Sequence, residues 1–432
     1  MLRIKKKIFR SLDGFFNKKI SFIKTSEFEK IIKRKISILG KGHSISGIPF
    51  NKKSLLIHPV LKEKITLNSK KQEVEANGNI EVYKIHNFLV KKKLYFPSFP
   101  SYPNVSLGAC VANCVHGNSP KYGVIKEYIN EVELYNPNFG YKILSPKKNK
   151  KLFYLTVGGM GMTGIITKVK LKIFKLKSNY ITIDRNIKFT TLIDTYKYLY
   201  KSKYIYNQNN IFINYSKKNF ILGRVSSGNF IGKKFKNKIL KEKKIYSLRL
   251  NFFKIPVFKK IIEKYILIKE LNFKNKMLHI NDAFYPSNSK ILYFNLMSKK
   301  FIEHQTIIPH KNVKKFLNEF EYMTKSTNPL ITLCHFKIFK GKSKYLQFDG
   351  KGLGLSVHVS INKNFDKFFK NFMNLNKKYN CVVNIYKNSC INSEKIKNMY
   401  GFKYQNFSKE IKKINNKYII VNSVFNKENF YK

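Results

Sequence analysis

Three glycine-rich runs hold the residues of this sequence that are best suited to bind a ligand. The first, Gly40 to Ser44, reads Gly-Lys-Gly-His-Ser. Two glycines at this spacing let the backbone turn sharply and present several N–H groups to one phosphate. The third glycine of a Rossmann fingerprint would fall at Ile45, and no long helix pattern follows. The run therefore indicates a phosphate-binding turn that is not of the NAD type.

The other two runs are suited to close contact with a flat ligand. Residues Ser106 to Gly117 are small, uncharged and rich in backbone donors, as a chain needs where it lies against a bulky planar group. Taken alone, this run reads equally well as a buried helix of small residues. Residues Val157 to Ile166 hold four glycines just before a strand, which indicates close backbone approach or strained turns.

The cysteines favour a reducing compartment and argue against a metal centre. Cys110, Cys114 and His116 have a spacing that zinc could use, but no second pair at finger spacing follows, so we expect no metal. The five cysteines are odd in number and scattered, which favours free thiols over disulfides. We therefore expect a cytoplasmic protein.

The composition predicts a folded and very basic protein. Its 432 residues exceed one typical core, and 43% of them are hydrophobic, so we expect two domains or a domain with a large insertion. The net charge of +61 would suit nucleic acid or an anionic membrane. However, only six of the 85 basic residues are arginines, and the lysines are spread over every segment. We attribute most of the charge to AT-rich codon bias and expect no specific nucleic-acid partner.

The amino terminus raises the question of membrane contact. No stretch reaches the roughly 18 apolar residues of a spanning helix. Ile4, Ile8, Phe9, Leu12 and Phe16 could line one face of a basic amphipathic helix. That face would either rest on the inner membrane as a peripheral contact or pack on the body of the protein.

The pattern of elements indicates an α+β fold. We expect a helix over 80–93, a short strand over 36–39, and a capping box at Ser26 and Glu29 that starts another helix. Alternating Val169, Leu171 and Ile173 predict a half-buried strand. Beyond residue 177, amphipathic helices around 313–323 and 365–372 alternate with strand-like runs at 211–215 and 291–296. This alternation of helix and strand patterns predicts helices that cover an antiparallel sheet.

The order and spacing of the three runs resemble the vanillyl-alcohol-oxidase superfamily of FAD-linked oxidases, and most of all its decaprenylphosphoryl-ribose 2′-oxidase branch. The likeness is densest at 152–166, which reads Leu-Phe-Tyr-Leu-Thr-Val-Gly-Gly-Met-Gly-Met-Thr-Gly-Ile-Ile. It implies a two-part PCMH-type FAD-binding domain, residues 1–176 and 382–432. An α+β substrate domain on an antiparallel sheet, residues 177–381, would be inserted between the two parts.

The resemblance also implies a set of cofactor contacts, with FAD as the cofactor. Around the pyrophosphate it places Ile38, Leu39, Gly40, Lys41, Gly42, His43, Ser44, Ile45, Ser46, Gly47 and Ile48. Along the flavin it places Ser101, Ser106, Leu107, Gly108, Ala109, Asn113, Cys114, Val115, His116, Ile166 and Asn384.

A second set of residues matches the family's substrate pocket: Gln305, Lys337, Ser356 and Lys387. We expect Lys387 and His116 to be catalytic, because an ammonium or amine beside the flavin can help a hydroxyl proton to leave or stabilise negative charge. In the sugar-oxidase branch an acidic residue follows this lysine, and a cysteine stands where this chain has Ser356. Here the residue after Lys387 is Asn388.

The implied activity is oxidation of a secondary alcohol of a sugar, by hydride transfer to flavin N5. The substrate would be a free sugar derivative or a sugar on a polyprenyl or nucleotide phosphate, and a short-chain reductase would act on the keto product in cell-envelope glycan synthesis. An aldonolactone or alditol oxidase is the alternative, because those relatives carry FAD covalently on the histidine that matches His43. Their His-Trp-Gly-Lys signature has no counterpart here, since the chain has no tryptophan.

Overall fold

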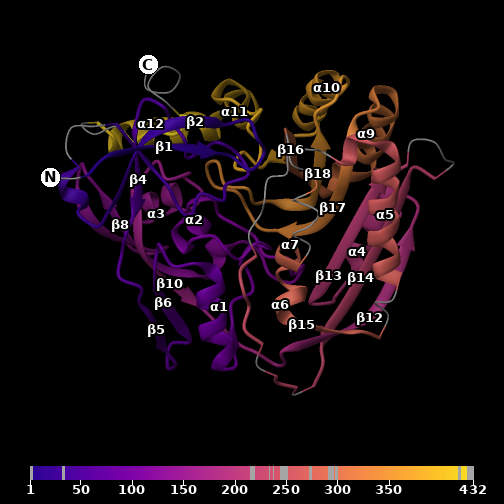
Figure 1. Ribbon diagram of the computed structural model, residues 1–432, viewed down its shortest axis with the longest axis horizontal. Helices are drawn as coiled ribbons and strands as arrows, with labels where there is room; N and C mark the ends of the chain where they lie inside the picture. Colours follow the sequence, from indigo (N-terminus) through magenta and orange to yellow (C-terminus); the bar gives the residue numbers. More distant parts are fainter. Residues whose placement is uncertain are drawn as a thin grey trace.

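The structure is a computed structural model that describes residues 3–31, 35–214, 219–232, 234–236, 238–243, 252–271, 275–289, 296, 300–416 and 420–425. It is a mixed α and β fold in which, among the described residues, a four-stranded sheet, a five-stranded sheet and a two-stranded sheet stand beside one large antiparallel sheet (Figure 1). The expected α+β class is confirmed at this level. The strand expected at 291–296 lies almost entirely outside the described residues.

The chain begins in a four-stranded sheet of order β1-β2-β4-β3, made of β1 (Lys5–Arg10), β2 (Asn17–Thr25), β3 (Ile36–Ile38) and β4 (Leu55–Pro59). The amphipathic helix expected from Ile4 to Phe16 is wrong, because β1 and β2 form an antiparallel hairpin. Turn chemistry decides this: Ser11 Oγ donates to Asp13 Oδ1 at 2.6 Å, and Gly14 has φ +75°. The membrane contact suggested for that helix therefore loses its basis.

The capping-box helix expected after Ser26 is also wrong. In the described residues 27–31 one 3₁₀ turn forms, Phe28–Lys30, and no side chain caps it. Phe28 is buried against Tyr135, with ring centroids 5.5 Å apart. Packing of this one aromatic ring therefore outweighs the local helix signal.

A five-stranded antiparallel sheet follows, of order β5-β6-β10-β8-β9. Its strands are β5 (Ile65–Asn68), β6 (Glu73–Asn77), β8 (Ile129–Asn136), β9 (Gly140–Leu144) and β10 (Ile165–Lys172). The alternation predicted for β10 is confirmed: Val169 and Leu171 are buried, and Lys170 lies 2.8 Å from Glu131 on the outer face. Helices α1 (Val82–Lys91), α2 (Leu107–Ala112) and α3 (Lys150–Thr156) accompany this sheet, and β7 (Leu94–Tyr95) pairs with β11 (Phe174–Lys175).

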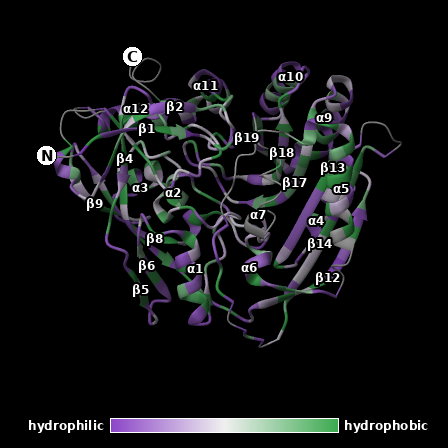
Figure 2. Cartoon of the chain, in the orientation of Figure 1, coloured by the Kyte–Doolittle hydropathy of each residue, from purple (hydrophilic) through white to green (hydrophobic). Residues whose placement is uncertain are grey.

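The large sheet has eight strands in the order β15-β12-β14-β13-β17-β18-β16-β19. They are β12 (Tyr180–Phe189), β13 (Tyr206–Ile213), β14 (Ile221–Phe230), β15 (Met277–His279), β16 (Phe301–Pro309), β17 (Leu330–Lys340), β18 (Lys351–Ser360) and β19 (Val382–Val383). Several strands alternate hydrophobic and hydrophilic residues along their length (Figure 2). Helices α4 (Leu192–Lys201) and α9 (Val313–Thr327) pack on this sheet, and α10 (Phe365–Lys378) packs on α9, which confirms both helices expected there.

The described chain also contains five further α-helices with defined bounds: α5 (Pro256–Leu271), α6 (Ile280–Ala283), α7 (Pro286–Ser289), α11 (Ser393–Tyr400) and α12 (Phe402–Ile414). After α12 the chain returns to the first sheet, where Val421 N donates to Ile36 O at 2.9 Å. All strands of the large sheet come from residues 180–383. The domain boundaries at 176 and 381 stay predictions. Among the described residues, no helix is long and apolar enough to cross a membrane.

Candidate active site

A cavity of about 800 Å³ lies between the amino-terminal sheets and one face of the large sheet. One wall is made of small residues: Gly40, Gly42, Gly78, Gly108, Ala109, Ala112 and Gly161. The opposite wall is made of polar and charged side chains that project from β13, β16, β17 and β18. The two walls offer different chemistry, one through backbone and the other through side chains.

The turn from Gly40 to Ile45 has the features of an anion site. Its carbonyl groups are used on the outside, where Gly40 O contacts His58 Nδ1 at 2.8 Å and Ser44 O accepts from Leu12 N at 3.1 Å. Within the described part of the chain, the N–H groups of residues 40–46 form no hydrogen bond. Gly42, with φ +77°, supplies the left-handed turn. Free amide donors around a left-handed glycine suit a phosphate.

Close backbone contact forms the rest of the small-residue wall. Gly108 N donates to Gly78 O at 2.7 Å, and a Cβ at Gly78 would stand 2.0 Å from Ile166 O. The run from Ser106 to Gly117 therefore fulfils both of its interpretations: α2 buries Leu107 and Cys110, while Gly108 and Ala109 face the cavity. The strained turns predicted for residues 157–166 are also present, since Gly164 has φ +135°.

The structure brings together most of the residues that the resemblance implied for FAD. The cavity is lined by Ile38, Leu39, Gly40, Lys41, Gly42, His43, Ser44, Ile45, Ile48, Ser101, Ser106, Gly108, Ala109, Asn113, Cys114, Val115, His116, Ile166 and Asn384. Ser46, Gly47 and Leu107 are not on the wall. Ser46 Oγ instead donates to Tyr386 O at 2.7 Å, Gly47 N donates to Ser389 Oγ at 3.0 Å, and Leu107 is fully buried in the core.

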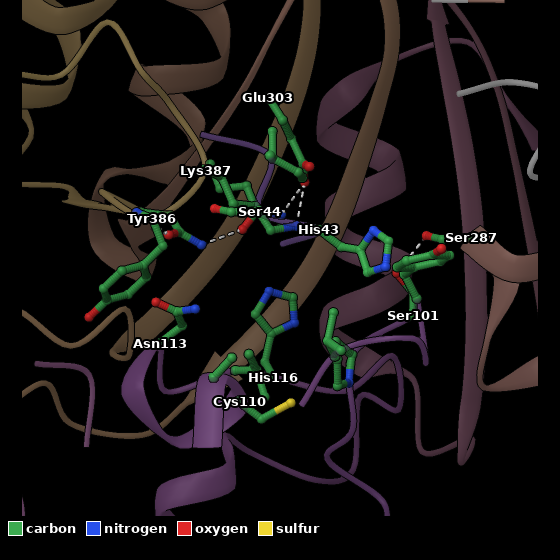
Figure 3. A pocket seen from close by; sticks show the side chains of 18 of the residues that line it. His43, Ser44, Ser101, Cys110, Asn113, His116, Ser287, Glu303, Tyr386 and Lys387 are labelled. Carbon is green, nitrogen blue, oxygen red and sulfur yellow. Dashed lines mark hydrogen bonds and ion pairs between the residues drawn. The ribbon is translucent and has the colours of Figure 1, made fainter. Parts of the chain in front are cut away.

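His43 lies on this wall beside Ser101 and Ser287 (Figure 3). Its Nε2 is 3.2 Å from Asn104 Nδ2, and its ring meets Tyr102 edge-on at 5.6 Å. Burial lowers the pKa of His43 below its usual value. The imidazole is therefore neutral at neutral pH, with the ring facing the cavity.

Lys387 forms the central ion pair of the opposite wall. Its Nζ lies 2.7 Å from Glu303 Oε1 (Figure 3). The segment that carries Lys387 runs along β16, since Asn384 N donates to Gln305 O at 2.8 Å and Asn384 Nδ2 donates to Gln305 Oε1 at 2.7 Å. Tyr386 OH, in the same segment, donates to Gly158 O at 2.7 Å. These bonds fix the place of Lys387 in the cavity.

Strand register explains why further polar groups face the same space. Gln305 on β16 pairs with Ser356 on β18, which pairs in turn with His335 on β17. Two residues away, Glu303 pairs with His358, so all five side chains lie on one face. Gln305 Nε2 donates to Glu303 Oε1 at 2.7 Å, and Ser356 Oγ lies 3.3 Å from the same oxygen.

Glu303 is therefore the hub of this wall. Burial alone would raise the pKa of its carboxyl, but Lys387 and the histidines His358 and His335 outweigh burial and lower the pKa to about 2. Sequence reasoning missed Glu303, His335 and His358. A signal was available for Glu303, because it is one of only 24 acidic residues in the chain and follows directly on the apolar pair Phe301 and Ile302.

Glu303 is the acidic partner of Lys387 in the folded protein, although no acidic residue follows Lys387 in the sequence. Asn388 is buried and turned away, with its Nδ2 3.1 Å from His304 Nδ1. Glu303 provides the carboxylate from another strand. The departure at residue 388 therefore leaves Lys387 with an acidic partner.

His116 and Lys337 meet at the end of α2. Lys337 Nζ donates to Gly117 O, and His116 Nδ1 lies 3.2 Å from the same oxygen. Burial lowers the pKa of Lys337 to about 7, opposed by Asp349 and Glu127. Burial and the charges of Lys337 and Lys387 lower the pKa of His116 to about 3. Because a carbonyl only accepts, Nδ1 of the neutral His116 carries the proton, and Nε2 is left as an acceptor.

Cys110 and Cys114 do not form a metal site with His116. Both thiols are buried, and burial raises the pKa of Cys114 to about 12. In the ranges that the structure describes, no group of three His, Cys, Asp or Glu residues could hold a metal ion.

Comparison with known proteins indicates which ligand the small-residue wall binds. Residues 25–138 match the FAD binding domain family. The chain is an FAD-binding protein of the vanillyl-alcohol-oxidase superfamily. The match contains the 40–48 turn and the 106–117 run, which agrees with the resemblance seen in the sequence.

The relatives of this FAD-binding protein act on sugar-like molecules, according to their names. It is 27% identical over 184 residues to D-arabinono-1,4-lactone oxidase of Candida glabrata (40% of this chain, 34% of the relative). It is 26% identical over 140 residues to a mitochondrial L-galactono-1,4-lactone dehydrogenase of Oryza sativa (32% and 24%). It is 24% identical over 180 residues to decaprenylphosphoryl-beta-D-ribose oxidase of Mycolicibacterium smegmatis (39% and 39%). The matched part thus spans between 24% and 39% of these three relatives.

The residues of the cavity fit FAD. The free amides of residues 40–46 can bind its pyrophosphate, and the glycine and alanine wall leaves room for a planar ring. Asn79 adds an unused acceptor, because its buried Oδ1 on the cavity wall has no hydrogen-bond partner among the described residues. The donors and the space on this wall therefore both fit FAD.

Proposed function

We propose that this protein is an FAD-dependent oxidoreductase that acts on the CH–OH group of a sugar-like substrate. The Lys387–Glu303 pair carries the proposal, because it places a fixed ammonium on the cavity wall opposite the small residues. When bound, FAD supplies a hydride acceptor at its N5 atom. The residues of the sheet face must then hold the substrate alcohol and remove its proton.

The charged side chains divide that work. Lys387 donates to the alcohol oxygen and stabilises the negative charge that develops there, while Glu303 holds the ammonium in place. His116 Nε2 and Gln305 accept and donate hydrogen bonds that orient the hydroxyl. Lys337 is the base, because its pKa of about 7 leaves a free amine available at neutral pH.

We further propose a substrate in which the sugar carries a phosphate linked to a polyprenyl chain or a nucleotide. The excess of lysines in this chain favours an anionic substrate, and one relative is named for such a sugar. Oxidation would give a keto-sugar, which a short-chain reductase can reduce to the epimer for cell-envelope glycan synthesis.

The test is anaerobic titration of the purified yellow protein with candidate alcohols. Addition of the right sugar derivative should bleach the flavin absorption within the time of mixing, and a sugar blocked at its secondary hydroxyl should leave the spectrum unchanged. A colourless protein that cannot be reconstituted with FAD would contradict the proposal.

An aldonolactone or alditol oxidase is the second candidate, and the placement of His43 favours it. A covalent bond to the flavin needs a neutral ring nitrogen on the cavity wall, and His43 has both properties. Acid precipitation separates the two candidates: flavin that stays with the precipitated protein supports the His43 linkage and this second function. Flavin that is released, in the native protein and in His43→Ala alike, supports the first.

A further inference from the structure

Helix α5 presents apolar side chains that are largely exposed, beside the cavity. Val257, Ile261, Tyr265 and Ile268 recur at helical spacing on one side of it and are 65%, 56%, 57% and 48% exposed. Figures 1 and 2 show this helix, which carries hydrophobic and hydrophilic residues, along the outer flank of the large sheet. We call these four residues the outer α5 stripe. Exposed apolar residues gathered in this way mark an interaction surface.

The other side of α5 is held by the protein. Ile262 and Ile266 pack on the cluster that contains Phe212, Phe253 and Leu333. The helix also contacts β14. The outer stripe therefore belongs to a helix that is anchored on its inner side, and burial of α5 in the fold does not account for it.

The surroundings of the stripe indicate what it binds. Lys260 and Lys264 are exposed and follow Val257 and Ile261 by three residues, so they border the stripe along the helix. A second copy of this chain would bring the same lysines and a net charge of +61 against each other. An anionic lipid surface instead accepts both features, because apolar side chains enter the acyl boundary while lysines stay with the head groups.

We propose that the outer α5 stripe docks the protein on the surface of an anionic membrane. Ile261 and Tyr265 belong both to the stripe and to the cavity wall, so docking would bring the mouth of the cavity to the lipid surface. A substrate with a lipid tail could then enter without leaving the bilayer. The docking itself does not depend on the flavin chemistry and is measured without turnover.

Flotation with phosphatidylcholine vesicles that contain phosphatidylglycerol tests the proposal, at a salt concentration high enough to screen the many surface lysines. The double variant Val257→Ser/Ile268→Ser changes neither cavity wall nor charge and should lower the partition coefficient roughly tenfold. The matched control is Tyr322→Ser/Phe402→Ser, which removes two residues that are 76% and 73% exposed on α9 and α12. The control should bind like the native protein. Equal binding of all three proteins overturns the proposal.

A single tryptophan gives a second and independent readout, since the chain has none. Emission of Val257→Trp should shift to the blue on addition of the same vesicles, and emission of Tyr322→Trp should not. If the stripe instead binds another copy, light scattering will show a dimer that the Val257→Ser/Ile268→Ser change dissociates, and the membrane proposal fails. Flavin content, read by absorbance in every variant, keeps these outcomes separate from the proposed enzymatic function.

Discussion

The two walls of the cavity recognise ligands in different ways. The wall formed by the 40–48 turn and α2 uses backbone amides and small residues, and its shape depends on contacts such as that between Gly108 N and Gly78 O. The wall formed by β16, β17 and β18 uses buried charged side chains around Glu303. The first wall can hold a cofactor through its backbone, whereas the second carries the charged side chains that can move protons. Changes on the two walls should therefore have separable effects on cofactor content and on turnover.

The largest effect is expected from Lys387→Met. Loss of the ammonium removes the donor to the alcohol oxygen, so kcat/KM should fall about 10³-fold, or ~4 kcal/mol. Flavin content should not change, because the other wall is intact. Stopped-flow measurement of flavin bleaching checks the rate. Lys344→Met, at an exposed lysine stacked on Tyr154, is the control and should keep full activity.

Gly78→Ala, in contrast to Lys387→Met, should lower the flavin content of the protein. The new Cβ would stand 2.0 Å from Ile166 O, which is backbone and cannot rotate away, so the variant should lose about 3 kcal/mol of stability and most of its FAD. Thermal unfolding and the ratio of flavin to protein absorbance measure both losses. Gly350→Ala meets only side-chain atoms at 3.6–3.8 Å and should change neither. Retention of normal flavin content in Gly78→Ala would show that this backbone approach does not shape the cofactor wall.

The pH profile examines the sheet wall alone. Burial lowers the pKa of Lys337 to about 7 from 10.5, so the ammonium loses its proton as pH rises through 7 and the flavin reduction rate should rise with it. In Lys337→Arg the side chain stays charged, so this rising limb of the pH profile should disappear. The flavin reduction rate at pH 8 should then be about 10²-fold lower than in the native protein. Lys351→Arg, at an exposed position on β18, should retain the limb. An unchanged limb in Lys337→Arg would assign it to another group.

Sequence reasoning found the backbone wall more completely than the side-chain wall, and the reason is physical. Glycines at Gly40, Gly42 and Gly108 leave a local signal, since only such residues permit the turn and the close approach. The group around Glu303 is assembled from strands far apart in the chain, and its members look like ordinary strand residues until register aligns them. Lys387 was found through the family pattern; its partner Glu303 required the structure.

Contacts that the local sequence pattern does not reveal also explain the expectations that were wrong. The expected amino-terminal helix is a hairpin because the short-range bonds of Ser11 and Asp13 favour a turn over a helix. Ser46 and Gly47 belong to the predicted turn by sequence, but they face residues 386 and 389 from the other end of the chain. Local pattern thus predicted the strand β3 and the helices α1, α9 and α10, while long-range contacts decided which residues of each run reach the cavity.

The smallest effect is expected from Glu303→Gln on stability, and it tests whether the hub of the sheet wall is electrostatic. The pKa of Glu303 lies near 2 in the folded protein against 4.5 ordinarily, so its pairing stabilises the fold above pH 4.5 and this contribution is lost as pH falls toward 2. Because Lys387 is 31% exposed, we expect a loss of only about 1 kcal/mol at pH 7.

Chemical denaturation of the native protein and of Glu303→Gln at several pH values measures this contribution. The difference between the two should be constant from pH 5 to pH 7 by the linkage relation and should close in more acidic solution. Glu321→Gln removes an exposed ion pair with Lys325 and should differ from the native protein by less than about 0.5 kcal/mol at every pH. A difference for Glu303→Gln that persists at pH 2 would mean that shape and hydrogen bonding, rather than charge, hold Lys387 in the cavity.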